Sequence, residues 1–144
     1  MKEDVDIDPD RLWRGWQKST PFENLVSMEL EAHDKDAGTV TLRLPYKAEY
    51  RRSDKPPTGY HGGAIATLID VAGDFAVAIK GNSGGVPTIN LAIDYLSSID
   101  EADLLAHARV RRLGRSIAVV DIDVEAPNGK LIAIGRGTYS TKTS

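Results

Sequence analysis

The sequence contains no cysteine among its 144 residues. Disulfide bonds, thiolate nucleophiles and cysteine-ligated zinc or iron–sulfur sites are therefore excluded. An excess of positive charge is also lacking, because 18 Lys and Arg stand against 21 Asp and Glu, and the formal net charge is −3. Five of the acidic residues lie within the first ten positions. Since a nucleic-acid binder shows a basic stripe, we expect no nucleic-acid partner.

The sequence also lacks a long hydrophobic run. Its longest apolar stretch, 64–79, is interrupted by Asp70, Gly73 and Asp74, and a bilayer span needs roughly 20 apolar residues. The acidic start differs from the basic start of a signal or transit peptide. We therefore expect a cytoplasmic protein with no membrane partner. Its length fits a single domain.

The N-terminal third predicts short elements. Asp8-Pro9 is a helix-start signal, and a helix carrying Trp13 and Trp16 as core anchors should follow an acidic leader that we expect to be disordered. After it we expect, in order, a turn or short helix from Thr20-Pro21, a strand near 26–32, a strand at 39–46 and a loop at 47–60.

The segment from His61 to Lys80 has a different pattern. Apolar residues lie on nearly every side of it, which is typical of a helix buried around most of its circumference. Two tight turns follow later, at Leu113-Gly114-Arg115 and Asn128-Gly129. They separate the last three of four strand-length runs, which lie at 86–96, 103–112, 116–125 and 130–140. This order predicts an α+β fold in which a curled antiparallel β-sheet wraps around one long central helix.

Two features of the predicted central helix suggest a catalytic site. Asp70 and Asp74 lie one turn apart on the same face, and a buried carboxylate needs a partner or a task. One interpretation of Asp70 is a carboxylate that reaches solvent through a gap; the other is an acid–base or nucleophilic group in a cleft. His61-Gly62-Gly63 opens the helix, where free backbone N–H groups are able to form an oxyanion hole. The alternative is a tight turn that merely requires glycine.

The order ββ–helix–ββββ, with His61-Gly62-Gly63 opening the helix and Asp70 nine residues after the histidine, resembles the hotdog-fold acyl-CoA thioesterases. The similarity is to the phenylacetic-acid-pathway (PaaI-like) and 4-hydroxybenzoyl-CoA types. It extends over about 20–140 and includes the segments 88–96, 112–116 and 128–133. The resemblance implies that residues 1–19 form a leader and short helix, and that residues 20–144 form a single hotdog domain.

The resemblance implies a role for each matching residue. Asp70 would be the catalytic carboxylate, as nucleophile or as general base, and the Gly62 amide would stabilise the oxyanion with His61 orienting the turn. Substrate-binding positions would be Gly63, Lys55, Asp74, Thr88, Asn90, Arg112, Gly114, Arg115 and Ser116, the last four on a segment that contacts CoA. No metal or cofactor is implied, apart from CoA as part of the substrate. The partner would be a second copy of the chain, in a dimer or a tetramer with sites between subunits.

Two departures and several alternatives stay open. Lys55 replaces the family's Asn or Gln, and Asp74 is a second carboxylate where relatives often have a smaller or uncharged residue. A non-catalytic acyl-CoA-binding or regulatory hotdog protein is therefore the alternative function. Residues 81–85 match Gly-x-Ser-x-Gly, but a nucleophile elbow requires a strand before it and a helix after it. A hydratase is a minor alternative because no histidine lies five residues after Asp70 or Asp74.

Overall fold

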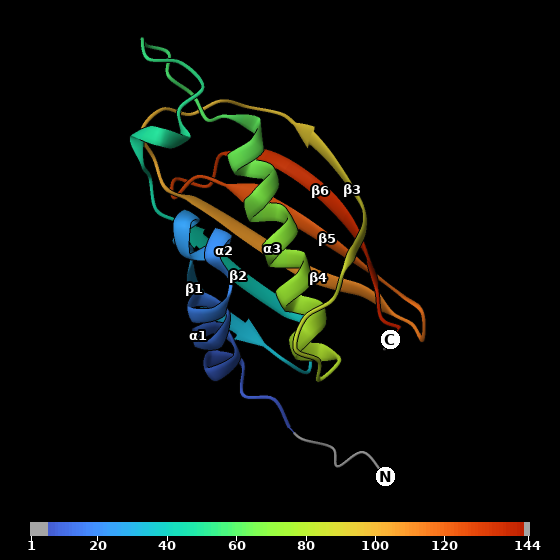
Figure 1. Ribbon diagram of the computed structural model, residues 1–144. Helices are drawn as coiled ribbons and strands as arrows, with labels where there is room; N and C mark the ends of the chain where they lie inside the picture. Colours follow the sequence, from blue (N-terminus) through green and yellow to red (C-terminus); the bar gives the residue numbers. More distant parts are fainter. Residues whose placement is uncertain (1–5, 143–144) are drawn as a thin grey trace.

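The computed structural model describes residues 6–142 of the chain (Figure 1). The expectation of a disordered leader concerns residues 1–8, of which 1–5 lie outside the described part. The elements are, in chain order, α1 (Pro9–Ser19), α2 (Pro21–Val26), β1 (Glu29–Asp34), β2 (Thr39–Leu44), the single-turn 3₁₀ helix η1 (Ala48–Tyr50), α3 (Gly62–Lys80), β3 (Thr88–Tyr95), β4 (Leu104–Leu113), β5 (Ile117–Glu125) and β6 (Leu131–Ser140). The Asp8 carboxylate caps α1 by accepting a hydrogen bond from the Asp10 backbone N–H.

The six strands form one antiparallel sheet in the order β1-β2-β4-β5-β6-β3. The β4–β5 and β5–β6 hairpins lie where the sequence predicted them. Strand β3, in contrast, pairs with β6 and not with β4, its neighbour in sequence, so that β1 and β3 are the two edges.

Helix α3 lies across the concave face of this sheet, which curls around it (Figure 1). Leu68, Ile69, Ala72, Phe75 and Ile79 have no exposed surface. By length and hydropathy alone α3 could cross a bilayer, but most of it is buried by the sheet. The predicted curled sheet around one central helix is confirmed, and this is the hotdog fold.

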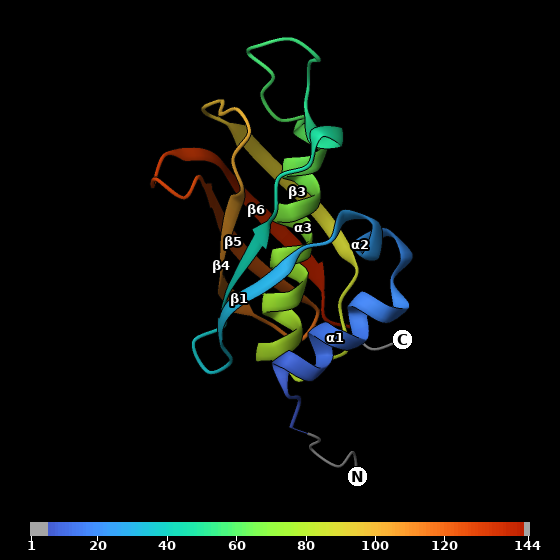
Figure 2. The ribbon, with the colours of Figure 1, turned by 90° about the vertical axis from the view of Figure 1, so that its left-hand side faces the viewer.

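The N-terminal helices cover part of the same side of the sheet (Figure 2). Trp13 and Trp16 are buried, and each ring meets the Phe75 ring of α3 edge-on at 5.1 Å between centroids. The prediction that these tryptophans anchor α1 on the core is confirmed. Such edge-to-face pairs stabilise beyond their buried area by about 1 kcal/mol each.

The predicted strand near 26–32 begins later than expected. Pro21 occupies the first helical position and favours a helix there, so that α2 runs to Val26. Ser27 then adopts a left-handed conformation with φ 56° and ends the helix. The strand starts at Glu29.

Candidate active site

Asp70 lies on the half-buried stripe of α3 that the sheet leaves uncovered. Its Oδ1 accepts a 2.6 Å hydrogen bond from the Thr88 hydroxyl at the start of β3. Its backbone carbonyl accepts a hydrogen bond of 3.0 Å from the buried Tyr139 hydroxyl. The carboxylate is thus held in one orientation at the boundary between α3 and the edge strand, with surface left open toward solvent.

A second carboxylate, Asp74, lies one turn further along the same stripe. Its Oδ1 accepts a hydrogen bond of 2.8 Å from the Val86 backbone N–H. Burial raises the pKa of Asp74 to about 7, and the negative charges of Asp70 and Glu23 act in the same direction. Burial also raises the pKa of Glu23, with a further contribution from Asp70. Three carboxyl groups from α2 and α3 therefore share one electrostatic environment.

The N-terminus of α3 is capped by its own histidine. His61 Nδ1 accepts a hydrogen bond of 2.9 Å from the Gly63 N–H, which places the proton of a neutral imidazole on Nε2. Its carbonyl accepts from Ala64 N–H at 3.0 Å. The Gly63 amide is therefore already occupied, whereas within residues 6–142 no acceptor engages the Gly62 N–H. The amide group available to an oxyanion is that of Gly62.

Tyr95, at the far end of β3, fixes this turn from the other side. Its hydroxyl donates a hydrogen bond of 2.9 Å to the Gly62 carbonyl. A Cβ at position 62 would meet the Tyr95 ring and hydroxyl at 3.3 Å. Strand β3 therefore contacts Asp70 through its first residue and Gly62 through its last.

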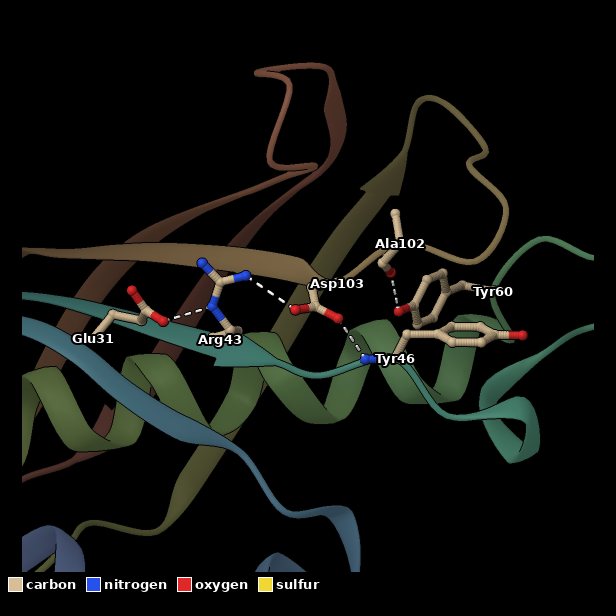
Figure 3. Close-up of polar contacts among 6 residues, drawn as sticks. All are labelled: Glu31, Arg43, Tyr46, Tyr60, Ala102 and Asp103. Atoms are coloured by element: carbon tan, nitrogen blue, oxygen red, sulfur yellow. Dashed lines mark hydrogen bonds and ion pairs between the residues drawn. The ribbon is translucent and has the colours of Figure 1, made fainter.

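The loop before His61 is fastened to the start of β4 (Figure 3). The Asp103 carboxylate accepts hydrogen bonds from Arg43 Nη1 at 3.0 Å and from the Tyr46 backbone N–H at 2.8 Å. The Tyr60 hydroxyl donates to the Ala102 carbonyl, and the His61 N–H donates to the Tyr50 carbonyl at 2.7 Å. These contacts hold both ends of the loop and so determine where α3 begins.

Within one chain the two predicted catalytic elements are too far apart to act on one bond. Asp70 lies eight positions after Gly62 in the helix, which at a rise of 1.5 Å per residue is about 12 Å. A carboxylate attacking a carbonyl carbon and an amide holding the carbonyl oxygen must each lie about 3 Å from the reacting group. Asp70 and Gly62 of the same chain do not satisfy that condition.

The remaining predicted site residues lie in three places. Asn90 is exposed on the edge strand β3 near Thr88. Lys55 is exposed on the 51–58 loop, which projects past the N-terminal end of α3 (Figure 2). The segment with Arg112, Gly114, Arg115 and Ser116 forms the β4–β5 hairpin at the opposite end, where Leu113 approaches Gly81. The structure therefore brings Asp70, Asp74 and Thr88 together and leaves Lys55 remote from them.

Two contributors to the site were not predicted from the sequence. Glu23 lies close enough to Asp70 and Asp74 for their charges to interact because α2 folds back beside α3. Tyr95 hydrogen-bonds Gly62 because β3 runs the length of the helix. Thr20-Pro21-Phe22-Glu23 has the spacing of a capping box, but Thr20 makes no side-chain capping bond. No local signal identified either contact.

Among residues 6–142, no three His, Asp or Glu side chains are arranged to hold a metal ion.

Fold and site together define a hotdog-fold protein with a helix-borne carboxylate and a free helix N-terminal amide. A family model described as the thioesterase superfamily matches residues 60–133. The chain belongs to this superfamily.

Relatives and solved structures agree with this assignment. A protein of Halobacterium salinarum, named as a candidate esterase, is 34% identical over 80% of this chain and 82% of its own. A crystal structure of a thioesterase-superfamily protein is 30% identical, with a TM-score of 0.81 over 93% of this chain and 98% of that one. The Escherichia coli PaaI protein of the phenylacetic acid degradation operon, at 20% identity, shares the fold with a TM-score of 0.80 over 94% of both chains. These likenesses support a hydrolase that acts on thioesters or esters.

Proposed function

We propose that the protein hydrolyses acyl-CoA thioesters at sites formed between two copies of the chain. Asp70 and Thr88 come from one subunit, and Gly62 and Tyr95 come from the other. The observation that carries this proposal is the edge strand β3, which contacts Asp70 at one end and Gly62 at the other.

The character of β3 supports pairing between copies. It is a sheet edge, and Ile89 and Tyr95 are more than half exposed on it, at 57% and 53%. Leu96, directly after it, is 52% exposed. An uncovered edge with exposed apolar side chains is a template for another strand. Pairing of β3 with β3 of a second copy would continue the sheet and bury these side chains about a two-fold axis.

Antiparallel pairing about that axis would complete the site. The Thr88 end of one β3 would then lie beside the Tyr95 end of the other. Because Thr88 is bonded to Asp70 and Tyr95 to Gly62, the carboxylate of one subunit would approach the free amide of its partner. This arrangement removes the separation of about 12 Å within one chain and gives two equivalent sites per dimer.

The chemistry follows from these groups. The Gly62 N–H would donate to the thioester carbonyl oxygen as negative charge develops on it. Asp70 would either attack the carbonyl carbon or take a proton from an attacking water. In both routes the carbon–sulfur bond breaks, the CoA thiolate leaves and is protonated, and water supplies the oxygen of the free acid. Thr88 orients Asp70 through its hydroxyl.

The position of the arginine hairpin fits CoA as the leaving group. The Thr141 N–H donates to the Ser116 carbonyl, and the Ser140 N–H donates to the Pro87 carbonyl directly before Thr88. The hairpin with Arg112 and Arg115 is thus connected to the Asp70 end of β3. Guanidinium groups match phosphate oxygens in pairs, and CoA carries three phosphates.

Two matched variants test the proposal. Asp70→Asn should lower kcat about 10³-fold without changing the melting temperature. Gly62→Pro should remove the oxyanion donor while keeping the helix, because proline is tolerated at the first helical position and His61 is extended, with ψ 131°. Gly62→Ala, which keeps the N–H, is its control. Thiol release from a panel of acyl-CoAs measures each rate.

Mixing the two inactive variants then distinguishes sites within a chain from sites between chains. After subunit exchange, half of the dimers would be mixed, and each mixed dimer would hold one intact site, so that about a quarter of wild-type activity should return. No recovery, with exchange verified by mass spectrometry, would contradict a site between subunits. Near-normal turnover of Asp70→Asn would contradict its catalytic role. Saturable acyl-CoA binding by wild-type protein without thiol release would instead favour a non-catalytic binding protein.

A further inference from the structure

An apolar groove lies beside the candidate site, on the side of α3 covered by α2. It has a volume of about 860 Å³, within the range of small-molecule sites. Its apolar lining comes from three elements of the chain: Phe22, Leu25 and Val26 of α2, Tyr50 of η1 and Ala64 of α3.

Two large apolar side chains that line this groove are exposed. Phe22 is 56% exposed and Leu25 is 72% exposed, although both lie on a helix that packs against the domain. Both line the groove, and more than half of the surface of each is open to solvent. A pair of large apolar side chains at the mouth of a groove is a surface that a ligand can cover.

Three of the polar side chains along the groove already have hydrogen-bond partners, and the Glu49 carboxylate and His61 also line it. The Tyr50 hydroxyl donates to the Val26 carbonyl, and the Thr67 hydroxyl donates to the Gly63 carbonyl at 2.9 Å. Lys47 Nζ donates to the Leu25 carbonyl and lies 5.9 Å from the centre of the Tyr50 ring. A ligand there would gain by burying apolar surface more than by forming new hydrogen bonds.

The groove is continuous with the predicted catalytic elements. It begins at Thr67, one helical turn before Asp70, and extends to Gly63 and His61 at the helix N-terminus. That distance is about 9 Å along α3, the length of an extended chain of about seven carbon–carbon bonds. Glu23, between Phe22 and Leu25 on α2, is close enough to Asp70 for their charges to interact.

We infer that this groove binds the acyl group of the substrate and that Phe22 and Leu25 determine acyl specificity. The substrate class is thioesters of uncharged apolar acids of medium size, linear or arylalkyl, and not acetyl or dicarboxylic groups. This inference rests on the proposed function, since it names the substrate of that site.

The test compares two groove variants with a matched surface variant. Phe22→Ala and Leu25→Ala shorten exposed side chains, and Leu131→Ala, at a residue 40% exposed on β6, is the control. The probes are acetyl-, hexanoyl-, octanoyl-, phenylacetyl- and succinyl-CoA. For the wild type, kcat/KM should rise about 3-fold to 4-fold per added methylene between acetyl and octanoyl. Each groove variant should lose about 10-fold on octanoyl- and phenylacetyl-CoA and less than about 2-fold on acetyl-CoA, and Leu131→Ala should match the wild type.

Several outcomes would overturn the inference. One is an unchanged chain-length preference in both groove variants. Another is a preference for succinyl-CoA. A third is a smaller oligomer for Leu25→Arg, by light scattering, with unaltered acyl preference, because a second copy of the chain would then be the occupant.

Binding separates this inference from the proposed function. Wild-type protein that hydrolyses no thioester contradicts the proposed function. Calorimetric titration of octanoyl-CoA then decides the role of the groove. Binding at least 10-fold weaker to the double variant Phe22→Ala/Leu25→Ala supports the groove, and equal binding overturns it.

Discussion

The two faces of α3 differ in what they contribute to the protein. The face toward the sheet carries Leu68, Ile69, Phe75 and Ile79, all without exposed surface. The opposite stripe carries Gly63, Thr67, Asp70 and Asp74, spaced by four, three and four residues and left partly open or exposed. One helix therefore supplies the apolar surface that packs against the curled sheet. Its opposite face carries polar groups that the sheet does not cover. Substitutions on the two faces should accordingly have separable effects on stability and activity.

The largest effect on stability is expected at Gly73, on the buried face. A Cβ there would lie 2.1 Å from the hydroxyl oxygen of Tyr139, a ring with no exposed surface. Gly73→Ala should therefore lower the free energy of unfolding by about 3 kcal/mol, as overpacking does in other cores. Chemical denaturation measures this loss. An equally stable variant would show that Tyr139 can move.

A smaller effect that depends on pH is expected at Asp74, on the open stripe. Its pKa in the folded protein is raised to about 7, above its value in the unfolded chain. Its contribution to stability is therefore fully present at low pH and is lost as the pH rises from about 4 through 7. The difference between this pKa and its ordinary value corresponds to about 4 kcal/mol of stability at most. Partial exposure of the Asp74 side chain should reduce this stability contribution to about half.

Asp74→Asn should remove this dependence on pH, because the side-chain amide does not titrate. Its oxygen can still accept the hydrogen bond from the Val86 N–H. Thermal unfolding at pH 5 and at pH 8 measures the effect. The wild type should lose stability relative to Asp74→Asn by about 1 kcal/mol between the two pH values. Parallel stability profiles for the two proteins would contradict a raised pKa.

The smallest effect is expected at Arg115, which is exposed on the β4–β5 hairpin and lies on neither face of α3. Arg115→Gln should raise KM for CoA thioesters about 5-fold to 10-fold, since one phosphate contact is lost. It should leave the melting temperature and kcat unchanged. Thioesters of pantetheine analogues without phosphates are the matched substrates, and an equal loss on these would argue against a phosphate role.

Most of the fold was predictable from local patterns. The apolar circumference of 61–80, the alternation along 116–125 and the Asn128-Gly129 turn each reflect contacts between near neighbours in the chain. The candidate site was predictable only in part. Asp70 and Gly62 stood out by their residue types, and Thr88 was named only through the family resemblance. Tyr95 was not predicted, because its contact with Gly62 depends on where β3 lies.

The sequence by itself determined that one apolar helix would be enclosed by a curled sheet, and that a histidine and two glycines would begin it. The tertiary structure decided that β3 would pair with β6 and become an edge strand. It also decided that the Gly63 N–H would donate a hydrogen bond to the His61 side chain, and that Glu23 would lie near Asp70. The physical reason is how far apart along the chain the contacting residues lie. Helix periodicity and turns are set by residues a few positions apart, whereas strand order and carboxylate proximity depend on which distant segments pack together to bury the most apolar surface.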